Sequence, residues 1–336
     1  MASTVRASKL GGLSALITGG SRGLGLLLCA RLAQRGCRVT IVARDPEELH
    51  RGADWVEERT GVPVSTVVCD VRDEAAVESA VREASGTMGG LDIVIANAGV
   101  IQVAPVTSLD AAAFDDAMAT IFRGTVNTAV TSLPHLRRST DGGRLCLIGS
   151  VGGLLAVPHL LPYSCAKAAV GTLGEGLRAE LSGDNVSVTT VHPGLMRTGS
   201  HLQAEFAGQP SKEFAWFSAL SGTPVVSMDA ERAAERIVQA LERRRTRLVL
   251  TPAARAAGLA HGVAPTAITR ISGLAAHLLP QAPSPAGAVA APVEQGHNID
   301  RSALTWAERV RRWGAGLNDR AASRYNQQVP GPPTSA

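Results

Sequence analysis

A glycine-rich turn stands between a strand pattern and a helix pattern near the beginning of the chain. The apolar run Leu13–Ile17 predicts a buried strand, and residues 24–33 carry apolar side chains in helical abundance. Between them lies Thr18-Gly-Gly-Ser-Arg-Gly-Leu-Gly25. Glycines let the backbone pass close to a diphosphate, and a helix N-terminus adds unpaired N–H groups and a favourable dipole. A lone glycine turn indicates little, but strand, turn and helix together predict a dinucleotide-binding site.

Strand-like runs alternate with helix-length segments from residue 13 to about residue 250. The expected strands span residues 15–18, 38–42, 64–69, 92–96, 144–148, 187–191 and 248–250. The expected helices span residues 23–35, 46–59, 74–84, 111–136, 163–181 and 230–243. This alternation predicts an α/β protein whose parallel sheet is covered by helices on both faces. Right-handed crossovers then give a doubly wound Rossmann fold, a single domain over residues 1–250 with ligands at the carboxyl ends of its strands.

A tyrosine and a lysine stand four residues apart in the segment Tyr163-Ser-Cys-Ala-Lys167, and Ser150 precedes them by thirteen residues. Residues i and i+4 of a helix share one face, so both side chains can point into one pocket. A free tyrosine has a pKa of about 10 and is a poor acid–base group at neutral pH. A neighbouring cation favours the phenolate and lowers that pKa. The pair therefore predicts an acid–base catalyst.

Taken in order along the chain, these motifs resemble those of the short-chain dehydrogenase/reductase family, in its ordinary shorter branch. The resemblance covers residues 10 to 250, about three quarters of the chain, and leaves a C-terminal extension. The matching motifs are Thr18–Gly25, Asp70-Val71, Asn97-Ala98-Gly99, Ser150, Tyr163 with Lys167, and Pro193-Gly194. Members of this family transfer a hydride between a nicotinamide cofactor and a carbonyl or alcohol group, so the resemblance implies an oxidoreductase.

The resemblance also implies which residues bind the cofactor. Asp70 would bond the adenine edge, and Pro193-Gly194 with Thr198 would position the nicotinamide ring. Two structural alternatives stay open, namely that Asp70 caps a helix and that Pro193-Gly194 is a plain turn. The full set of expected cofactor residues is Thr18, Gly19, Ser21, Arg22, Gly23, Leu24, Gly25, Arg44, Asp70, Val71, Asn97, Ala98, Gly99, Tyr163, Lys167, Pro193, Gly194 and Thr198.

The same resemblance assigns the chemistry to three side chains. Tyr163 would give a proton to a carbonyl oxygen or take one from an alcohol. Ser150 would hydrogen-bond that same oxygen. Lys167 would hold the nicotinamide ribose and lower the pKa of Tyr163.

The end of the second expected strand indicates which nicotinamide cofactor is preferred. An acidic residue there would bind the ribose 2′-hydroxyl of NAD and repel a 2′-phosphate. Here the position holds Ala43, followed by Arg44, and Arg22 lies in the glycine turn on the same side. Two guanidinium groups make a good clamp for a phosphate dianion, which favours NADP(H) over NAD(H). The competing interpretation is that Arg44 pairs with Asp45 or Glu48 on the surface.

One position departs from the family pattern. The family usually carries an asparagine three residues before the glycine that corresponds to Gly124, where it links the catalytic lysine to solvent. This chain has Ile121 there, whose side chain can neither donate nor accept a hydrogen bond. Either Thr120 or a backbone carbonyl with water replaces the relay, or turnover is slow. The alternative function is therefore an NADP(H)-binding sensor or scaffold with little or no turnover.

An aromatic cluster follows the Pro193-Gly194 motif in a chain with few aromatic residues. In the family, the corresponding segment, here about residues 200–228, forms a lid over the substrate. A lid of this kind favours a bulky apolar carbonyl or alcohol, such as a lipid-like, steroid-like or retinoid-like molecule. The alternative is a helix that packs its own core. The cluster consists of Phe206, Phe214, Trp216 and Phe217.

Beyond residue 250 the resemblance fades. Residues 251–280 predict a helical extension broken at Pro265, and residues 281–300 predict a Pro/Ala-rich linker. Residues 301–336 predict an amphipathic helix and a tail. A basic helix that carries tryptophan could contact a membrane surface peripherally. The alternative is that it docks on the protein itself or on a sister subunit.

Composition excludes several other classes. The net charge of +4 at pH 7 is a mild excess with no aromatic-interleaved basic patch, so we expect no nucleic-acid partner. The five cysteines lack metal-ligand spacing, which favours buried thiols in a reducing compartment and no metal site. No run has the length and composition of a signal peptide or a transmembrane helix. We therefore expect a soluble cytoplasmic protein that forms a homo-oligomer.

Overall fold

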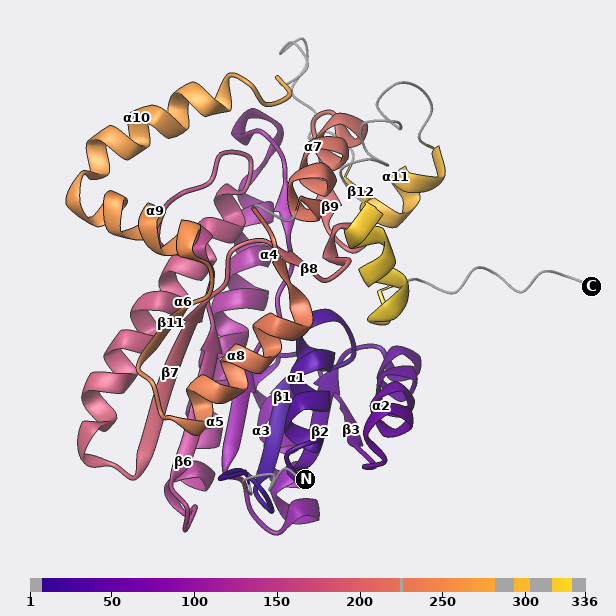
Figure 1. Cartoon of the computed structure of the whole chain (residues 1–336), viewed down its shortest axis with the longest axis vertical. Helices are drawn as coiled ribbons and strands as arrows, with labels where there is room; N and C mark the ends of the chain where they lie inside the picture. Colours follow the sequence, from indigo (N-terminus) through magenta and orange to yellow (C-terminus); the bar gives the residue numbers. More distant parts are fainter. Residues whose placement is uncertain (1–7, 224–225, 282–292, 303–315, 328–336) are drawn as a thin grey trace, which may run out of the picture.

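A computed structural model describes residues 8–223, 226–281, 293–302 and 316–327. A sheet of seven parallel strands lies between two layers of helices (Figure 1). In spatial order the strands are β3 (Ser65–Val68), β2 (Arg38–Ala43), β1 (Ser14–Thr18), β4 (Ile93–Ala96), β6 (Gly143–Ile148), β7 (Val186–His192) and β11 (Arg247–Val249). All seven expected strands are confirmed, each to within one residue at either end, and so is the doubly wound Rossmann fold.

The two helical layers bury opposite faces of the sheet because side chains alternate along each strand. Ile17 and Ile95 belong to one core cluster, and their neighbours Leu16 and Val94 belong to the other. The first cluster is covered by α1 (Gly23–Ala33), α2 (Pro46–Thr60) and α8 (Ala230–Glu242). The second is covered by α3 (Glu74–Met88), α5 (Gly124–Arg137) and α6 (Leu161–Glu180).

Aspartates fix where three of these helices begin. The side chains of Asp45, Asp73 and Asp229 accept hydrogen bonds from backbone N–H groups in the first turns of α2, α3 and α8. Such caps satisfy N–H groups that the helix itself leaves unpaired. Since Asp73 caps α3, the alternative interpretation of Asp70 as a helix cap is wrong.

The helix expected over residues 111–136 has an irregular middle. It consists of α4 (Ala111–Ala117), a π-helical segment η2 (Met118–Arg123) and α5. Apolar periodicity alone does not distinguish this wider turn from a regular helix. Wide turns of this kind occur preferentially beside functional sites, and η2 packs against α6, which carries Tyr163 and Lys167.

The expected ligand-binding edge of the sheet lies where the order of the strands reverses, between β1 and β4. From β1 the chain winds outward through β2 and β3, then returns to β4 on the other side of β1. The connections that follow β1 and β4 therefore diverge, which opens a crevice at the carboxyl ends of these strands. Gly19 follows β1 and Asn97 follows β4, so both lie at this edge, as expected.

Small elements cover the same edge. Short strands form two further sheets, β8 (Met196–Arg197) with β10 (Met228–Asp229), and β9 (Glu205–Phe206) with β5 (Gln102–Val103) and β12 (Glu294–Gln295). Helix α7 (Pro210–Gly222) packs beside them. Single short turns complete this region, namely η1 (Val106–Ser108), η3 (Val151–Gly153) and η5 (Ser200–Leu202). A further turn, η4 (Leu181–Gly183), joins α6 to the beginning of β7 at the opposite edge.

The extension beyond residue 250 begins as expected. Helices α9 (Pro252–Val263) and α10 (Pro265–Ala276) are separated at Pro265 (Figure 1). The linker expected over residues 281–300 is wrong in its last part, where β12 pairs with β9 and α11 (Gly296–Ser302) follows. Glycine permits this, because a Cβ on Gly296 would stand 2.0 Å from the carbonyl oxygen of His201. Residues 282–292 lie outside the described part of the chain.

The C-terminal region comes back to the domain. Residues 316–324 are helical and lie near α1 and α2, although they are remote from both in sequence (Figure 1). Most of the expected amphipathic helix, at residues 303–315, and the tail from residue 328 lie outside the described residues. Within the described ranges, none of the helices combines the length and apolarity needed to cross a bilayer.

Candidate active site

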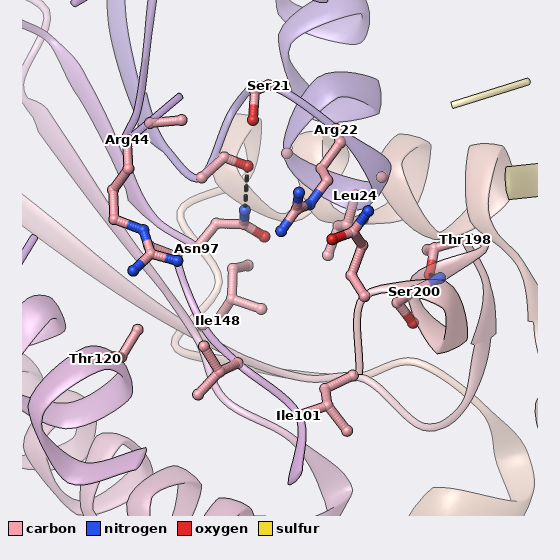
Figure 2. A pocket seen from close by; sticks show the side chains of 18 of the residues that line it. Ser21, Arg22, Leu24, Arg44, Asn97, Ile101, Thr120, Ile148, Thr198 and Ser200 are labelled. Atoms are coloured by element: carbon pink, nitrogen blue, oxygen red, sulfur yellow. Dashed lines mark hydrogen bonds between the residues drawn. The ribbon is translucent and has the colours of Figure 1, made fainter. Parts of the chain in front are cut away.

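A cavity of about 940 Å³ opens at the carboxyl ends of β1, β2, β4 and β6 (Figure 2). Of the residues predicted from the sequence, only Thr18 and Ser150 are not among its lining. The predicted residues that do line it are Gly19, Ser21, Arg22, Gly23, Leu24, Gly25, Arg44, Asp70, Val71, Asn97, Ala98, Gly99, Tyr163, Lys167, Pro193, Gly194 and Thr198. Residues from widely separated parts of the chain thus meet around one space.

The glycine turn has a backbone that other residues would not adopt easily. Gly19 and Gly23 have positive φ angles, of +63° and +55°, and a Cβ on Gly25 would stand 2.0 Å from the Gly19 carbonyl oxygen. The turn therefore brings the backbone at the N-terminus of α1 against the cavity. This is the geometry that a diphosphate requires.

Thr18 has a different position from the one expected of a cofactor ligand. Its hydroxyl accepts a hydrogen bond from the Asn97 backbone N–H at 3.1 Å. In return, the Asn97 carboxamide donates to the carbonyl oxygens of Thr18 (3.1 Å) and Gly19 (3.0 Å). Thr18 therefore ties β1 to β4 beneath the cavity, and Asn97 braces the first bend of the glycine turn.

The two arginines predicted to clamp a phosphate reach toward the pocket from two elements. In Figure 2, Arg44 extends from the end of β2 and Arg22 from the glycine turn. Arg22 forms an ion pair with Glu48, whose carboxylate also accepts a hydrogen bond from Ser21. Asp45 is occupied as the cap of α2. Arg44 is exposed and has no ion pair within the described part of the chain, so its predicted pairing with Asp45 or Glu48 is wrong.

Asp70 lies at the adjoining wall, just after β3. Its carboxylate forms an ion pair with Arg72, with an oxygen–nitrogen distance of 2.6 Å. Partial burial raises the pKa of Asp70, but the hydrogen bonds and charge of Arg72 outweigh that effect and hold the pKa below its ordinary value. A carboxylate that stays ionised and faces the cavity can accept a hydrogen bond from an amino group.

Tyr163, Lys167 and Ser150 meet where β6 ends. The Lys167 ammonium donates a hydrogen bond to the Ile148 carbonyl oxygen at 2.6 Å and lies 5.8 Å from the centre of the Tyr163 ring. Ser150 lies within interaction range of the Tyr163 hydroxyl and partly offsets the effect of burial on the tyrosine pKa. Ser150 is held in place because its Oγ accepts from the Gly152 N–H at 3.0 Å. Three groups able to exchange protons are therefore clustered beside the glycine turn.

The pKa of Tyr163 departs from the expectation drawn from sequence. Burial raises its pKa, and the hydrogen bond with Ser150 offsets only part of that rise. Burial also lowers the pKa of Lys167, to about 8. The expected lowering of the tyrosine pKa by Lys167 is not observed, because desolvation dominates at both groups and the ammonium is directed at Ile148.

Ile121 is fully buried in the second core cluster, inside the π-helical segment. Its carbonyl oxygen accepts a hydrogen bond from the Thr125 hydroxyl at 2.6 Å. The nearest asparagine, Asn127, instead donates to the Val71 carbonyl oxygen at 2.9 Å. Thr120, the side chain predicted to replace the relay asparagine, lines the cavity (Figure 2).

The aromatic cluster forms a third core and does not line the cavity. The rings of Phe206 and Phe214 meet edge to face at 5.4 Å, and those of Trp216 and Phe217 meet at 5.8 Å. They pack with residues from other segments, among them Leu160. The alternative of a segment that packs its own core accounts for the aromatic residues.

Several cavity residues have no counterpart among the sequence-based predictions. They come from the end of β6, strand β8 and the loop after it, strand β12 and the C-terminal region. They include Ile148, Met196, Ser200, Gln203, Gln295 and Gln327. Gln327 in particular carries no local signal, since only the tertiary structure brings the C-terminal region to the glycine turn.

Comparisons with known proteins agree with this geometry. A family model described as short chain dehydrogenase matches residues 14–206, more than half of the chain. An uncharacterized oxidoreductase of Staphylococcus aureus strain USA300 is 32% identical over 184 residues, which cover 55% of this chain and 78% of the relative.

Two solved structures are similar as well. A dehydrogenase/reductase from Sinorhizobium meliloti 1021 has a TM-score of 0.63 at 28% identity, covering 73% of this chain and 95% of that one. A short chain dehydrogenase from Burkholderia cenocepacia J2315, solved in complex with NADP, has a TM-score of 0.63 at 25% identity, covering 74% and 99%. With its fold, glycine turn and Ser–Tyr–Lys cluster, the chain belongs to the short-chain dehydrogenase/reductase family of oxidoreductases.

Proposed function

We propose that the protein is an NADP(H)-preferring dehydrogenase/reductase that interconverts a carbonyl group and a secondary alcohol. The observation that carries this proposal is the cluster of Ser150, Tyr163 and Lys167 beside a cavity that begins at the glycine turn. The cavity, at about 940 Å³, is large enough for a dinucleotide together with a small substrate.

The residues around the cavity fit NADP(H). The glycine turn places the N-terminus of α1 at the cavity wall, which suits a diphosphate. Arg44 is exposed and free of ion pairs among the described residues, so it is available to a 2′-phosphate dianion. Asp70 would bind the adenine edge, and the loop with Pro193, Gly194 and Thr198 would support the nicotinamide end. The solved Burkholderia relative in complex with NADP supports the same cofactor.

Side chains of the protein would carry out the proton transfer of the reaction. When bound, the nicotinamide supplies or accepts the hydride at the substrate carbon. In reduction, Tyr163 donates its hydroxyl proton to the carbonyl oxygen, which becomes the alcohol oxygen, while Ser150 hydrogen-bonds that oxygen. The raised pKa of Tyr163 keeps the phenol protonated and ready to donate. Lys167, whose pKa burial lowers to about 8, is largely cationic at neutral pH and would hold the nicotinamide ribose.

For the substrate we propose an apolar carbonyl compound or alcohol. The support comes from residues that line the cavity and not from the aromatic cluster, which packs in a core of its own. The cavity lining includes the apolar residues Val100, Ile101 and Ala204. Glu205 is also part of the lining, and burial raises its pKa, which makes its carboxyl less costly beside an apolar ligand. The segment of about 200–228 would then contribute its main chain and small side chains to the substrate end.

The test is NADPH oxidation against a panel of apolar ketones and aldehydes. Tyr163→Phe should lower turnover by about 10² to 10⁴-fold while its affinity for NADPH stays close to that of the wild type. Ser150→Ala should also lose turnover, whereas Ser187→Ala, at a buried serine in β7 away from the cavity, should retain it. Turnover that persists in Tyr163→Phe would contradict the assignment.

The second candidate function is an NADP(H)-binding sensor or scaffold, which the buried Ile121 favours because it removes the family's proton relay. The same assay separates the two functions. Tight NADPH binding with no Tyr163-dependent turnover of any panel member would support the sensor, and Tyr163-dependent turnover would exclude it.

A further inference from the structure

The C-terminal residues 316–327, here called the strap, connect two sides of the cofactor cavity. One side is the glycine turn of residues 18–25, and the other is the loop of residues 198–203 that follows β8. Both are part of the proposed cofactor site. A segment that joins them is positioned to act on whatever lies between them.

Three consecutive strap residues contact the glycine turn. The Gly23 N–H donates a hydrogen bond to the Tyr325 carbonyl oxygen at 3.0 Å. The Asn326 side chain donates to the carbonyl oxygens of Ser21 (2.9 Å) and Glu48 (3.1 Å). The Tyr325 ring is buried in the first core cluster, edge to face with Trp55 at 6.4 Å. The strap is therefore anchored through buried and polar contacts on this side.

The other side is anchored equally firmly. The Asn318 carboxamide accepts a hydrogen bond from the Gly199 N–H at 2.8 Å and contacts His201 at 2.8 Å. His201 also contacts Asp319 at 2.9 Å. A Cβ on Gly199 would stand 2.3 Å from the Cα of Ala322, so the two backbones are in close contact.

Gln327 places a polar side chain between these anchors. It is 4% exposed and lines the cavity, and its carbonyl oxygen accepts a hydrogen bond from Gln203 at 2.9 Å. Its Nε2 lies 2.6 Å from the position of a Cβ on Gly23. Its buried Oε1 has no hydrogen-bond partner among the described residues. Buried polar atoms are nearly always paired, so an unpaired one on a residue that lines a cavity points to a partner supplied by a ligand.

We infer that the strap is part of the cofactor site and that Gln327 binds the dinucleotide. This inference rests on the proposed NADP(H) binding. The carboxamide offers N–H donors to diphosphate oxygens and an acceptor to a ribose hydroxyl, and it stands at the end of α1 where the diphosphate belongs. Because the strap joins both sides of the cavity, bound cofactor is enclosed beneath it, and release requires the strap to detach.

Stopped-flow fluorescence with NADPH tests this binding role without any turnover. Gln327→Ala should raise the Kd and the dissociation rate about tenfold, equivalent to the loss of one hydrogen bond to a charged group. Asn318→Ala, which loosens the strap without touching the cavity, should raise the dissociation rate as well. Gln34→Ala is the matched control, because Gln34 is an exposed glutamine at the far end of α1.

Limited trypsin digestion provides a second, independent measurement. The strap has two exposed cleavage positions, at Arg320 and Arg324. Saturating NADPH should slow cleavage at both several-fold in the wild type and much less in Gln327→Ala.

The outcomes separate the inference from the function on which it rests. Wild-type NADPH binding with equal Kd values for Gln327→Ala and Gln34→Ala would overturn the role of Gln327. Tighter binding by Gln327→Ala would also overturn it, since the strap would then obstruct the site. A wild-type protein that binds neither NADPH nor NADH would overturn the proposed function and the strap's role together.

Discussion

The Lys167 ammonium is hydrogen-bonded to the carbonyl oxygen of Ile148 at 2.6 Å, at the point where the central strand β6 reaches the cavity. Both residues are nearly enclosed by protein, with Lys167 at 5% and Ile148 at 5% exposure. A single carbonyl compensates little of the hydration that an ammonium loses on burial. Burial of the Lys167 ammonium therefore lowers the free energy of unfolding of the protein while the lysine is charged.

That cost predicts how stability depends on pH in the cofactor-free protein. The folded-state pKa of Lys167, about 8, lies below the value of about 10.4 for an unfolded chain. Between these values the unfolded chain binds the proton and the folded protein does not, so the free energy of unfolding rises with pH. Lys167→Met should remove a rise on the order of 3 kcal/mol between pH 7.5 and pH 10.

Urea unfolding at a series of pH values measures this effect. The matched control is Lys212→Met, because Lys212 is exposed on α7. If the wild type and Lys167→Met change in parallel with pH, the lysine is not desolvated as its position indicates.

Arg44→Asp should reverse the preference between NADPH and NADH. The variant removes a cation at the end of β2 that has no ion pair among the described residues. It places a carboxylate where it would accept the ribose 2′-hydroxyl of NADH and repel a 2′-phosphate. We expect the ratio of the two Kd values to change roughly 10- to 100-fold. Fluorescence titrations measure it, with Arg51→Asp on the outer part of α2 as control. An unchanged ratio would exclude Arg44 from phosphate binding.

Glu48→Gln should tighten NADPH binding. The Glu48 carboxylate holds Arg22 in an ion pair, so it both occupies that guanidinium and adds negative charge near the expected 2′-phosphate. The neutral isostere keeps the shape and frees Arg22, so NADPH affinity should rise about threefold to tenfold while NADH affinity stays constant. Glu57→Gln, at an exposed residue farther along α2 that does not line the cavity, should change neither. Weaker NADPH binding in Glu48→Gln would show that the ion pair orders the turn instead.

Ile121→Asn should destabilise the protein. Ile121 is fully buried in an apolar cluster, and a carboxamide there loses packing and finds no clear partner. We expect a loss of about 3 kcal/mol in the free energy of unfolding, against about 1 kcal/mol for Ile121→Val. Urea unfolding of both variants decides the point. If the asparagine costs no more than the valine, the site already contains the partners of the family's usual asparagine.

Local patterns were sufficient to predict much of the fold. The alternation of apolar runs and helical segments located all seven strands of the sheet, because burial on both faces requires apolar side chains throughout a parallel strand. The glycine turn could also be predicted from sequence, because only glycine fits positions such as Gly25. Family resemblance then brought together Tyr163, Lys167 and the turn, which do line one cavity.

Interactions between distant segments escaped prediction. The sequence predicted Arg22 and Arg44 as a phosphate clamp and left a pairing of Arg44 with Asp45 or Glu48 as the alternative, but the folded chain pairs Glu48 with Arg22. The pKa values of Tyr163 and Lys167 depend on desolvation, which no spacing of residues expresses. The aromatic residues after residue 200 fill a core of their own because β9, α7 and α11 come together there.

The sequence by itself determined the strands of the α/β sheet and the glycine turn, because each depends on a short stretch of chain. Only the tertiary structure decided which distant residues meet at the cavity, how charged they are and what encloses them. Burial, which sets the pKa of Lys167, is a property of the whole packed domain. The hydrogen bond between Gly23 and Tyr325 joins the two ends of the chain, and no local pattern anticipates a contact at that separation.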